Sequence, residues 1–321
     1  MSIAPMTLKV ESMNGQISRL ALLSLIAALL VTLTACTKKD AQPQAKPSRI
    51  SATKTYEKYF GLAPTTDKGT CYAFVIYFPS AKESGKVVPF PFFTFDEGTI
   101  KKVAVERLLS GMDVGSYQGE FLQVLPPDIH LLGIIDENGI VTLNFDKQIL
   151  MGKTDAKGEQ AFLNALVLTV SQFDGVKEVR VQVEGKEQGM VEGKEVADFL
   201  GHGGLKRQPV AVDESMVLEP GPPRLLSITA VKDKGAKNVE DVSAYFDRPV
   251  DIQELRMSDS KGKAFEGDVF ESVFDMAAVL KPKDPSVFRA QMPIKVRWKV
   301  KDKRGRQGEG DNVWLLEMKE H

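Results

Sequence analysis

The stretch ALVLTVSQFDGVKEVRVQVEGK, residues 165–186, decides the fold of the central part of this chain. Apolar residues recur in it at steps of three or four as far as Phe173, as on the buried face of a helix, and Asp174-Gly175 ends the run. From Val179 to Val183 valines alternate with polar residues, which is the pattern of a half-buried strand. The sequence therefore predicts a helix that leads directly into a strand.

The residues before this stretch add more elements of both kinds. Residues 71–78, CYAFVIYF, are apolar on both faces and predict an interior strand, whereas the aromatic run 90–95 contains Pro91 and fits an edge strand or an extended loop. Residues 100–109 predict a helix that Ser110-Gly111 ends, and residues 129–145 predict a hairpin that turns at Asn138-Gly139. Together these elements predict an α+β fold in which two helices cover a small sheet.

The last hundred residues show strand patterns only. A passage rich in glycine and proline ends in EPGPP, residues 219–223, and marks the best domain boundary in the chain. Beyond it, apolar and basic residues alternate cleanly from Ile294 to Lys301. Several short strands with turn signals predict an all-β sandwich. The expected domains are residues 70–210 and 224–321, with a linker at 211–223 between them.

The N-terminal stretch LALLSLIAALLVTLTAC, residues 20–36, predicts export. Its apolar part is shorter than the ~20 residues that a membrane-spanning helix needs, and small residues precede Cys36 as in the cleavage motif of bacterial lipoproteins. We therefore expect a lipoprotein signal peptide at 1–35, lipid on Cys36 and a polar tether at 36–69, with translation starting at Met1 or Met13. An ordinary cleaved signal or a retained anchor helix stays open, as does docking of residues 55–60 on the first domain.

Composition excludes some classes of function. The chain has 42 basic and 43 acidic residues and a net charge of -1, so no global field favours nucleic acid. Of the two cysteines, Cys36 is the expected lipid site, which leaves Cys71 unpaired. Cys71 is either a small buried apolar residue or a reactive thiol.

The sequence contains few of the residues and motifs that catalytic sites use. Only three histidines are present, and no GxSxG, HExxH, CxxC or phosphate-loop motif occurs. We interpret His130, expected inside a strand, and His202, in a Gly-His-Gly-Gly loop, as structural, and the glycines of that loop as a turn rather than an anion cradle. We therefore predict no enzyme, no cofactor and no metal, although a carboxylate pair of a wall hydrolase stays possible.

Seven basic residues crowd one short interval near the C-terminus: Lys295, Arg297, Lys299, Lys301, Lys303, Arg304 and Arg306. Where they alternate with apolar residues they fit an ordinary solvated strand face. The functional alternative is a patch that binds an anionic partner such as lipid headgroups or cell-wall polymer.

Several blocks in order resemble the GerMN domain of sporulation and germination lipoproteins. They are YAFVIYFPS from Tyr72, VERLLSG from Val105, LPPDIHLLGIIDENGIVTLNF from Leu125, the helix-to-strand passage from Ala165, and Leu200-Gly201-His202. This resemblance covers roughly residues 70–210. It implies a small α/β domain without known catalysis, often lipid-tethered and in some members assembling in the envelope. Some members carry two tandem copies, whereas this sequence shows one.

A second resemblance concerns residues 224–321. The segments YFDRPVD from Tyr245, residues 292–300, and KDKRGRQGEG from Lys301 are similar to extracytoplasmic bacterial Ig-like domains, some of which bind copper. No histidines or clustered methionines stand at ligand spacing here, so we predict no copper site.

These observations lead to one main hypothesis about function. We expect a non-catalytic lipoprotein of the cell envelope, lipid-anchored to the membrane, that docks against an envelope protein or against copies of itself. The alternatives are a binding module for cell-wall polymer or anionic lipid, and an unrecognised peptidoglycan hydrolase. Thr37 after Cys36 favours the outer membrane if the cell has two membranes.

Overall fold

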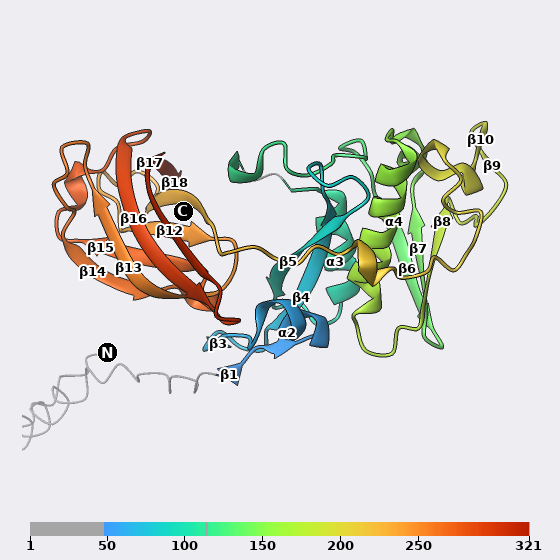
Figure 1. The fold of residues 1–321 in the computed structure, drawn as a ribbon, viewed down its shortest axis with the longest axis horizontal. Helices are drawn as coiled ribbons and strands as arrows, with labels where there is room; N and C mark the ends of the chain where they lie inside the picture. The colour runs from blue at the N-terminus through green and yellow to red at the C-terminus, as the bar shows by residue number, and fades with distance from the viewer. Residues whose placement is uncertain (1–47, 113–114, 321) are drawn as a thin grey trace, which may run out of the picture. The chain divides into compact units, whose positions relative to one another are not determined.

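The computed structural model describes residues 48–112 and 115–320 (Figure 1). Cys36 and the predicted signal peptide lie outside these residues. Residues 47–321 form one compact unit, within which two hydrophobic cores are distinct. We call residues 48–218, which enclose the first core, the first lobe, and residues 225–320, which enclose the second, the second lobe. No helix in the described part of the chain is long and apolar enough to cross a membrane.

The first lobe contains two three-stranded sheets, with strand orders β2-β4-β5 and β6-β7-β8. Its helices are α2 (Lys54–Phe60), α3 (Ile100–Leu109) and α4 (Ala156–Ser171). Its longer strands are β4 (Tyr72–Pro79), β5 (Val87–Thr94), β6 (Leu131–Glu137), β7 (Ile140–Phe145) and β8 (Glu178–Val183). Its short strands are β1 (Ser48–Arg49), β2 (Ser51–Ala52), β3 (Thr65–Thr66), β9 (Met190–Val191) and β10 (Lys194–Glu195).

Helix α4 is the centre of this lobe. Asp155 caps its first turn through a 2.7 Å hydrogen bond from Gly158 N, and every residue from Ala161 to Val170 is buried. The helix contacts β4, β5 and β8, so it packs against both sheets (Figure 1). A helix that is apolar on all sides must be enclosed. The first lobe therefore has two sheets and not the single sheet that was predicted. Helix α4 packs against both sheets and does not merely cover one face of one sheet.

Glutamine side chains bond to strand backbone at two places in this lobe where no strand pairs with it. Gln172, at the end of α4, accepts a hydrogen bond from Val75 N at 2.8 Å and donates one to Val75 O at 2.5 Å, as a neighbouring strand would. Gln208 does the same for β8, with bonds of 2.8 Å from Val181 N and 3.0 Å to Val181 O. Edge backbone groups that would otherwise pair with another chain are thereby satisfied inside the molecule.

Two segments predicted as tether and linker are part of the first lobe. Residues 48–69 were expected to be a polar tether, yet Tyr56, Tyr59 and Phe60 on α2 are almost completely buried in the first core. This corrects the tether in favour of docking, because three aromatic rings on one short helix gain far more from burial than from solvent. In the expected linker, Met216 is buried and Leu218 N donates to Val87 O at 2.9 Å.

The second lobe consists of strands, apart from short 3₁₀ turns. Its strands are β11 (Leu225–Lys232), β12 (Asp241–Phe246), β13 (Val250–Ser258), β14 (Gly267–Glu271), β15 (Ala277–Pro282), β16 (Pro293–Asp302), β17 (Gln307–Leu315) and β18 (Glu317–Glu320). They form a five-stranded sheet, β14-β15-β12-β11-β18, and a three-stranded sheet, β13-β16-β17. Both sheets contribute to one core, and the apolar residues of β16 face it as their alternation predicts.

Candidate functional site: a buried ionic junction

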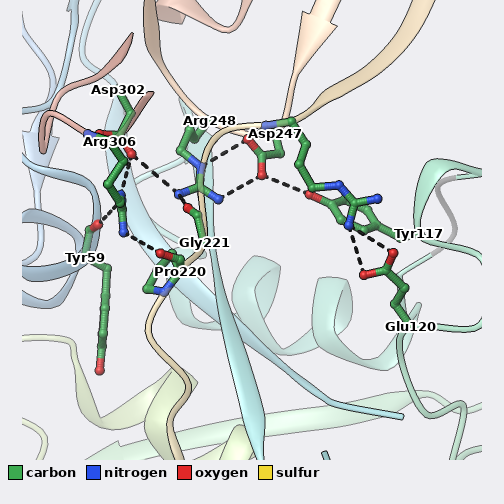
Figure 2. Close-up of polar contacts among 10 residues, drawn as sticks. Tyr59, Tyr117, Glu120, Pro220, Gly221, Asp247, Arg248, Asp302 and Arg306 are labelled. Carbon is green, nitrogen blue, oxygen red and sulfur yellow. Dashed lines mark hydrogen bonds and ion pairs between the residues drawn. The ribbon is translucent and has the colours of Figure 1, made fainter. Parts of the chain in front are cut away.

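The polar cluster that stands out most in the described chain lies where residues of the two lobes meet (Figure 2). At its centre, Arg248 follows β12 in the turn Asp247-Arg248-Pro249, and its side chain is only 7% exposed. The guanidinium donates Nε to Asp247 Oδ1 at 3.0 Å and Nη2 to Asp247 Oδ2 at 2.8 Å. Nη1 donates to Gly221 O at 2.9 Å and lies 3.5 Å from Asp302 Oδ2. We call this cluster and its two arms the ionic junction.

One arm runs from Asp302 to helix α2. Arg306, in the β16–β17 hairpin, donates Nε to Asp302 Oδ2 at 2.6 Å and Nη2 to Tyr59 O at 2.7 Å. Its Nη1 donates to Pro220 O at 3.0 Å. The same hairpin presses on Gly61 after α2, where a Cβ would lie 2.7 Å from Lys303 O. Because Gly61 also has a φ of +79°, only glycine fits there without strain.

The other arm runs from Asp247 into the first lobe. Tyr117 OH donates to Asp247 Oδ2 at 3.0 Å, and the Arg224 guanidinium stacks 4.5 Å from the centre of the Tyr117 ring. Arg224 Nη1 lies 2.9 Å from both carboxylate oxygens of Glu120, and its Nη2 donates to Ser116 O. Ser116 in turn donates to Leu226 O. The arm therefore connects strand β11 to the loop after α3 through contacts in both directions.

The electrostatics keep Arg248, Glu120 and Tyr117 in their ordinary protonation states at neutral pH. Burial alone would lower the pKa of Arg248, but the adjacent Asp247 and Asp302 raise it above its usual value. Burial opposes ionisation of Glu120, yet hydrogen bonds from Arg224 and Lys82 hold its pKa below the usual range. Burial, with Asp247 beside it, raises the pKa of Tyr117. None of these three pKa values is moved toward neutrality, as proton transfer would require.

A second contact between the lobes is aromatic. Phe274, between β14 and β15, stacks on Phe93 with ring centroids 4.8 Å apart and planes 5° apart, and lies 5.7 Å from Phe95. Phe274 and Asp275 both have positive φ, 72° and 52°, which L-residues rarely adopt. Asp275 also lies 2.9 Å from Lys303 Nζ. Such strain persists only where surrounding contacts impose it, so these contacts hold the turn in place.

A cavity of about 1480 Å³ opens beside the ionic junction. Tyr117, Glu120, Arg224 and Trp314 contribute to its walls. Within the described residues its lining includes neither a histidine nor a cysteine. The base and thiol that nucleophilic catalysis most often uses are therefore missing from its walls.

The seven predicted basic residues do not form one patch. Arg306 points into the contacts between the lobes, whereas Lys303 pairs within the second lobe, with Asp251 at 2.6 Å and Asp275 at 2.9 Å. Lys295 and Arg297 lie on the exposed face of β16 and pair with Asp311 and Glu254, each at 3.3 Å. Lys299 has Glu254 and Glu309 as its cross-strand neighbours, and Lys301 and Arg304 are exposed. Acidic residues of the flanking strands thus surround the stripe, as on a solvated face.

Two of the histidines have partners in the structure. His202 Nε2 lies 2.8 Å from Thr154 O, and its backbone N–H donates to the Glu159 carboxylate at 2.9 Å. His130 precedes β6 rather than lying inside a strand, and its Nδ1 lies 3.0 Å from Asp146 Oδ2 in an exposed position.

The glycine-rich loop 201–204 is filled from within. Glu159 on α4 is 2% exposed, and a Cβ on Gly204 would overlap its carboxylate. Burial raises the pKa of Glu159, while hydrogen bonds from the backbone of His202 and Gly204 oppose that rise. The anion that this loop holds is a side chain of the protein itself, which agrees with its interpretation as a structural turn.

Cys71 is buried and unpaired, and burial raises the pKa of its thiol. This environment fits the prediction of a small apolar residue, since reactive thiols need a lowered pKa and access. No three histidine, cysteine or acidic side chains of residues 48–112 and 115–320 lie close enough together to hold a metal ion.

Sequence reasoning missed the ionic junction. The segment YFDRPVD was noted only for its resemblance, although an Asp-Arg pair between an apolar strand and a proline is an unusual place for two charges. That signal does not reveal the partners, because Tyr117 and Asp302 lie far away in sequence.

The family comparison identifies the central domain. Residues 75–189 match the family model described as Germane: Sporulation and spore germination. These residues therefore form a GerMN-type domain, which confirms the first resemblance. No curated protein matches the chain.

Solved structures give weaker similarities. The first GerMN domain of the sporulation protein GerM from Bacillus subtilis is 21% identical, over 40% of this chain and 96% of that chain, with a TM-score of 0.31. The tandem GerMN domains of the same protein are 13% identical, over 61% of this chain and 58% of that chain, with a TM-score of 0.34. CopC from Methylosinus trichosporium OB3b is 19% identical, over 31% of this chain and 97% of that chain, with a TM-score of 0.22. At such TM-scores these similarities assign no function to the chain, and the Ig-like resemblance of the second lobe stays a prediction.

Proposed function

We propose that this chain is a non-catalytic lipoprotein of the cell envelope whose GerMN-type domain docks against an envelope protein or against another copy of itself. The second lobe, which we propose to be Ig-like, acts as a spacer or a second contact surface. The observation that carries the proposal is the ionic junction. Its buried charges are paired with one another and with backbone groups, so it serves to fix the two lobes together rather than to react.

The physical reason lies in what buried ion pairs contribute. Removing two charges from water costs about as much as their attraction returns, so such a pair adds little to net stability. It does penalise any arrangement that leaves one charge without its partner. Arg306 binds Tyr59 O of the first lobe, and Tyr117 OH of the first lobe binds Asp247. Arg224, which leads into the second lobe, pairs with Glu120 of the first, so separating the lobes would break all three contacts. A two-lobed body held together in this way is suited to presenting a docking surface.

The anchor in this proposal is a lipid on Cys36, which is a prediction from the sequence alone. It places the protein outside the cytoplasm, and in the outer membrane of a cell with two membranes. Mass spectrometry of the chain from its native membrane should show an N-terminal Cys36 that carries acyl chains. A Cys36→Ser variant should be recovered in the soluble fraction, whereas an unmodified wild-type product would contradict the anchor.

Docking is tested on the full chain. Light scattering of the protein in mild detergent, together with crosslinking in native envelopes, should show self-association or capture a partner protein. A strictly monomeric chain that captures no partner would contradict the proposal. Peptidoglycan turnover by the purified chain would contradict the non-catalytic role.

A further inference from the structure

Side chains and prolines protect several strand edges of the first lobe. Gln172 bonds to Val75 of β4 beyond the two-residue strand β2, and Gln208 bonds to Val181 of β8. The outer edge of β5 pairs with the chain at Val217 and carries Pro89 and Pro91, which have no N–H to offer. Natural proteins use such devices to prevent pairing with other chains.

Strand β6 is the exception. It is an edge strand that pairs only with β7, and no other described segment hydrogen-bonds to the backbone of residues 131–137. Two large apolar side chains on it are half exposed, Leu132 at 51% and Ile135 at 52%. A groove of about 360 Å³ runs between this strand and the start of α3. An open apolar edge beside a groove is the geometry in which another strand is added to a sheet.

Gly133 stands beside a β-bulge, because the pairing of β6 with β7 shifts between Leu131 and Gly133. From Gly133 to Glu137 the pairing with β7 is regular, so this part of the strand presents a regular outer edge. The φ of Gly133 is not positive, and a Cβ placed on it would meet nothing within 4 Å. A glycine in this position also leaves room for the close approach of another backbone.

The charges along the strand indicate which partner fits. Strand β6 follows the exposed imidazole of His130, whose Nδ1 bonds to Asp146, and ends in Asp136, which pairs with Lys101, and Glu137. Two copies related by a twofold axis would pair antiparallel, which sets His130 of each copy near the carboxylates of the other and keeps the two acidic ends apart. The apolar residues Leu132 and Ile135 of one copy would then pack against the same two residues of the other copy.

We propose that two copies of this chain associate through antiparallel pairing of their β6 edges, so that each adds a strand to the other's β6-β7-β8 sheet. This inference rests on the proposed docking role and names its surface and partner.

The test uses a photo-crosslinkable residue in the full chain, at Ile135 in one variant. The matched control carries it at Val313, which is 65% exposed on β17, an edge strand of the second lobe. In detergent and in native envelopes, crosslinking from position 135 should give a product of twice the chain mass, and position 313 should give none. A dimer crosslinked from 313 but not from 135 would overturn the inference.

The crosslinking result also separates this inference from the proposed function. A product of position 135 with a different protein would overturn the pairing of two copies but leave the docking role intact. No product from either position, with a monomeric chain, would contradict both.

Two further variants make the test quantitative. Gly133→Val fits the open space of the single chain but blocks the approach of a second backbone, and Ile135→Lys adds a charge that opposes edge pairing. Each should raise the dissociation constant of the dimer at least tenfold in sedimentation equilibrium, with an unchanged circular dichroism spectrum. The control Val313→Lys should leave the constant unchanged. A dimer that survives both β6 variants would refute the pairing.

Discussion

Strand β16 presents the same kinds of charge in two settings. On its outer face, Lys295 and Arg297 pair with single carboxylates while about half exposed to water. At its end, Asp302 is 1% exposed in its side chain and is shared by Arg248 and Arg306. Nothing in the sequence distinguishes the exposed charged residues of this strand from the buried one. The comparison shows that burial decides whether a charge is a solvated surface group or part of the contact that fixes two lobes.

The sharpest test of this comparison is removal of one buried cation. Arg248→Ala leaves Asp247 buried without its main partner and removes one of the two cations beside Asp302, so we expect the free energy of unfolding to fall by about 3–5 kcal/mol. Arg297→Ala, on the exposed face, should cost no more than about 1 kcal/mol. Urea unfolding of both variants measures the difference, and equal losses would show that burial does not separate the two settings.

The ionic junction can also be broken through the backbone. Gly61→Ala puts a Cβ against Lys303 O in a conformation with positive φ, so we expect a loss of about 3 kcal/mol. Gly175 has a φ of +86° but open space around its Cβ, so Gly175→Ala should cost only about 1 kcal/mol from φ alone. Thermal unfolding of the two variants compares them. A Gly61 variant no worse than the Gly175 control would mean that the hairpin readily moves away.

The aromatic contact between the lobes should have a smaller effect. Phe274→Ala removes the stack on Phe93 and part of the contact with Phe95, which is expected to cost about 1–2 kcal/mol. Phe274→Gly loses the same ring but relieves the positive φ, so it should be the more stable of the two variants. The reverse order in thermal melts would show that the turn is not strained.

The smallest of the predicted effects is that of acid on the arm of the ionic junction that contains Glu120. Hydrogen bonds from Arg224 and Lys82 hold the pKa of Glu120 below its usual 4.5 despite the opposing effect of burial. A carboxyl with a lowered pKa adds stability above its unfolded pKa and loses it as pH falls through the folded one. Glu120→Gln should therefore be less stable than wild type by about 0.2–1 kcal/mol at neutral pH, and the gap should close below pH 4.5. Melting curves from pH 7 to 3 measure it, and a constant gap would exclude ionisation of Glu120 as the cause.

The parts of the fold that repeat a local pattern could be predicted from sequence. Helix α4 and strands β8 and β16 follow from the spacing of their apolar residues, because periodicity records which face is buried. The burial of Cys71 followed from its place before an apolar strand.

What depends on distant partners could not be predicted. In the sequence, Gln172 and Gln208 look like ordinary polar residues. In the structure, the side chain of each forms the hydrogen bonds of a neighbouring strand with a backbone group tens of residues away. The charges of Arg248 and Arg306 gave no sign of their burial, since it arises only when several segments meet. Residues 54–60 looked like tether because their aromatic rings have no partner nearby in sequence.

The burial of α4 from Ala161 to Val170 has a consequence for how this protein unfolds. This part of the helix cannot persist when either of its sheets detaches, since that would expose Phe162, Leu166 and Val170 together. The lobe should therefore open as a single cooperative event, and amide hydrogens in α4, β4 and β7 should exchange with solvent at one common, slow rate. Fragments cut between β5 and α4 would then hold no native structure separately, and would regain it only when mixed.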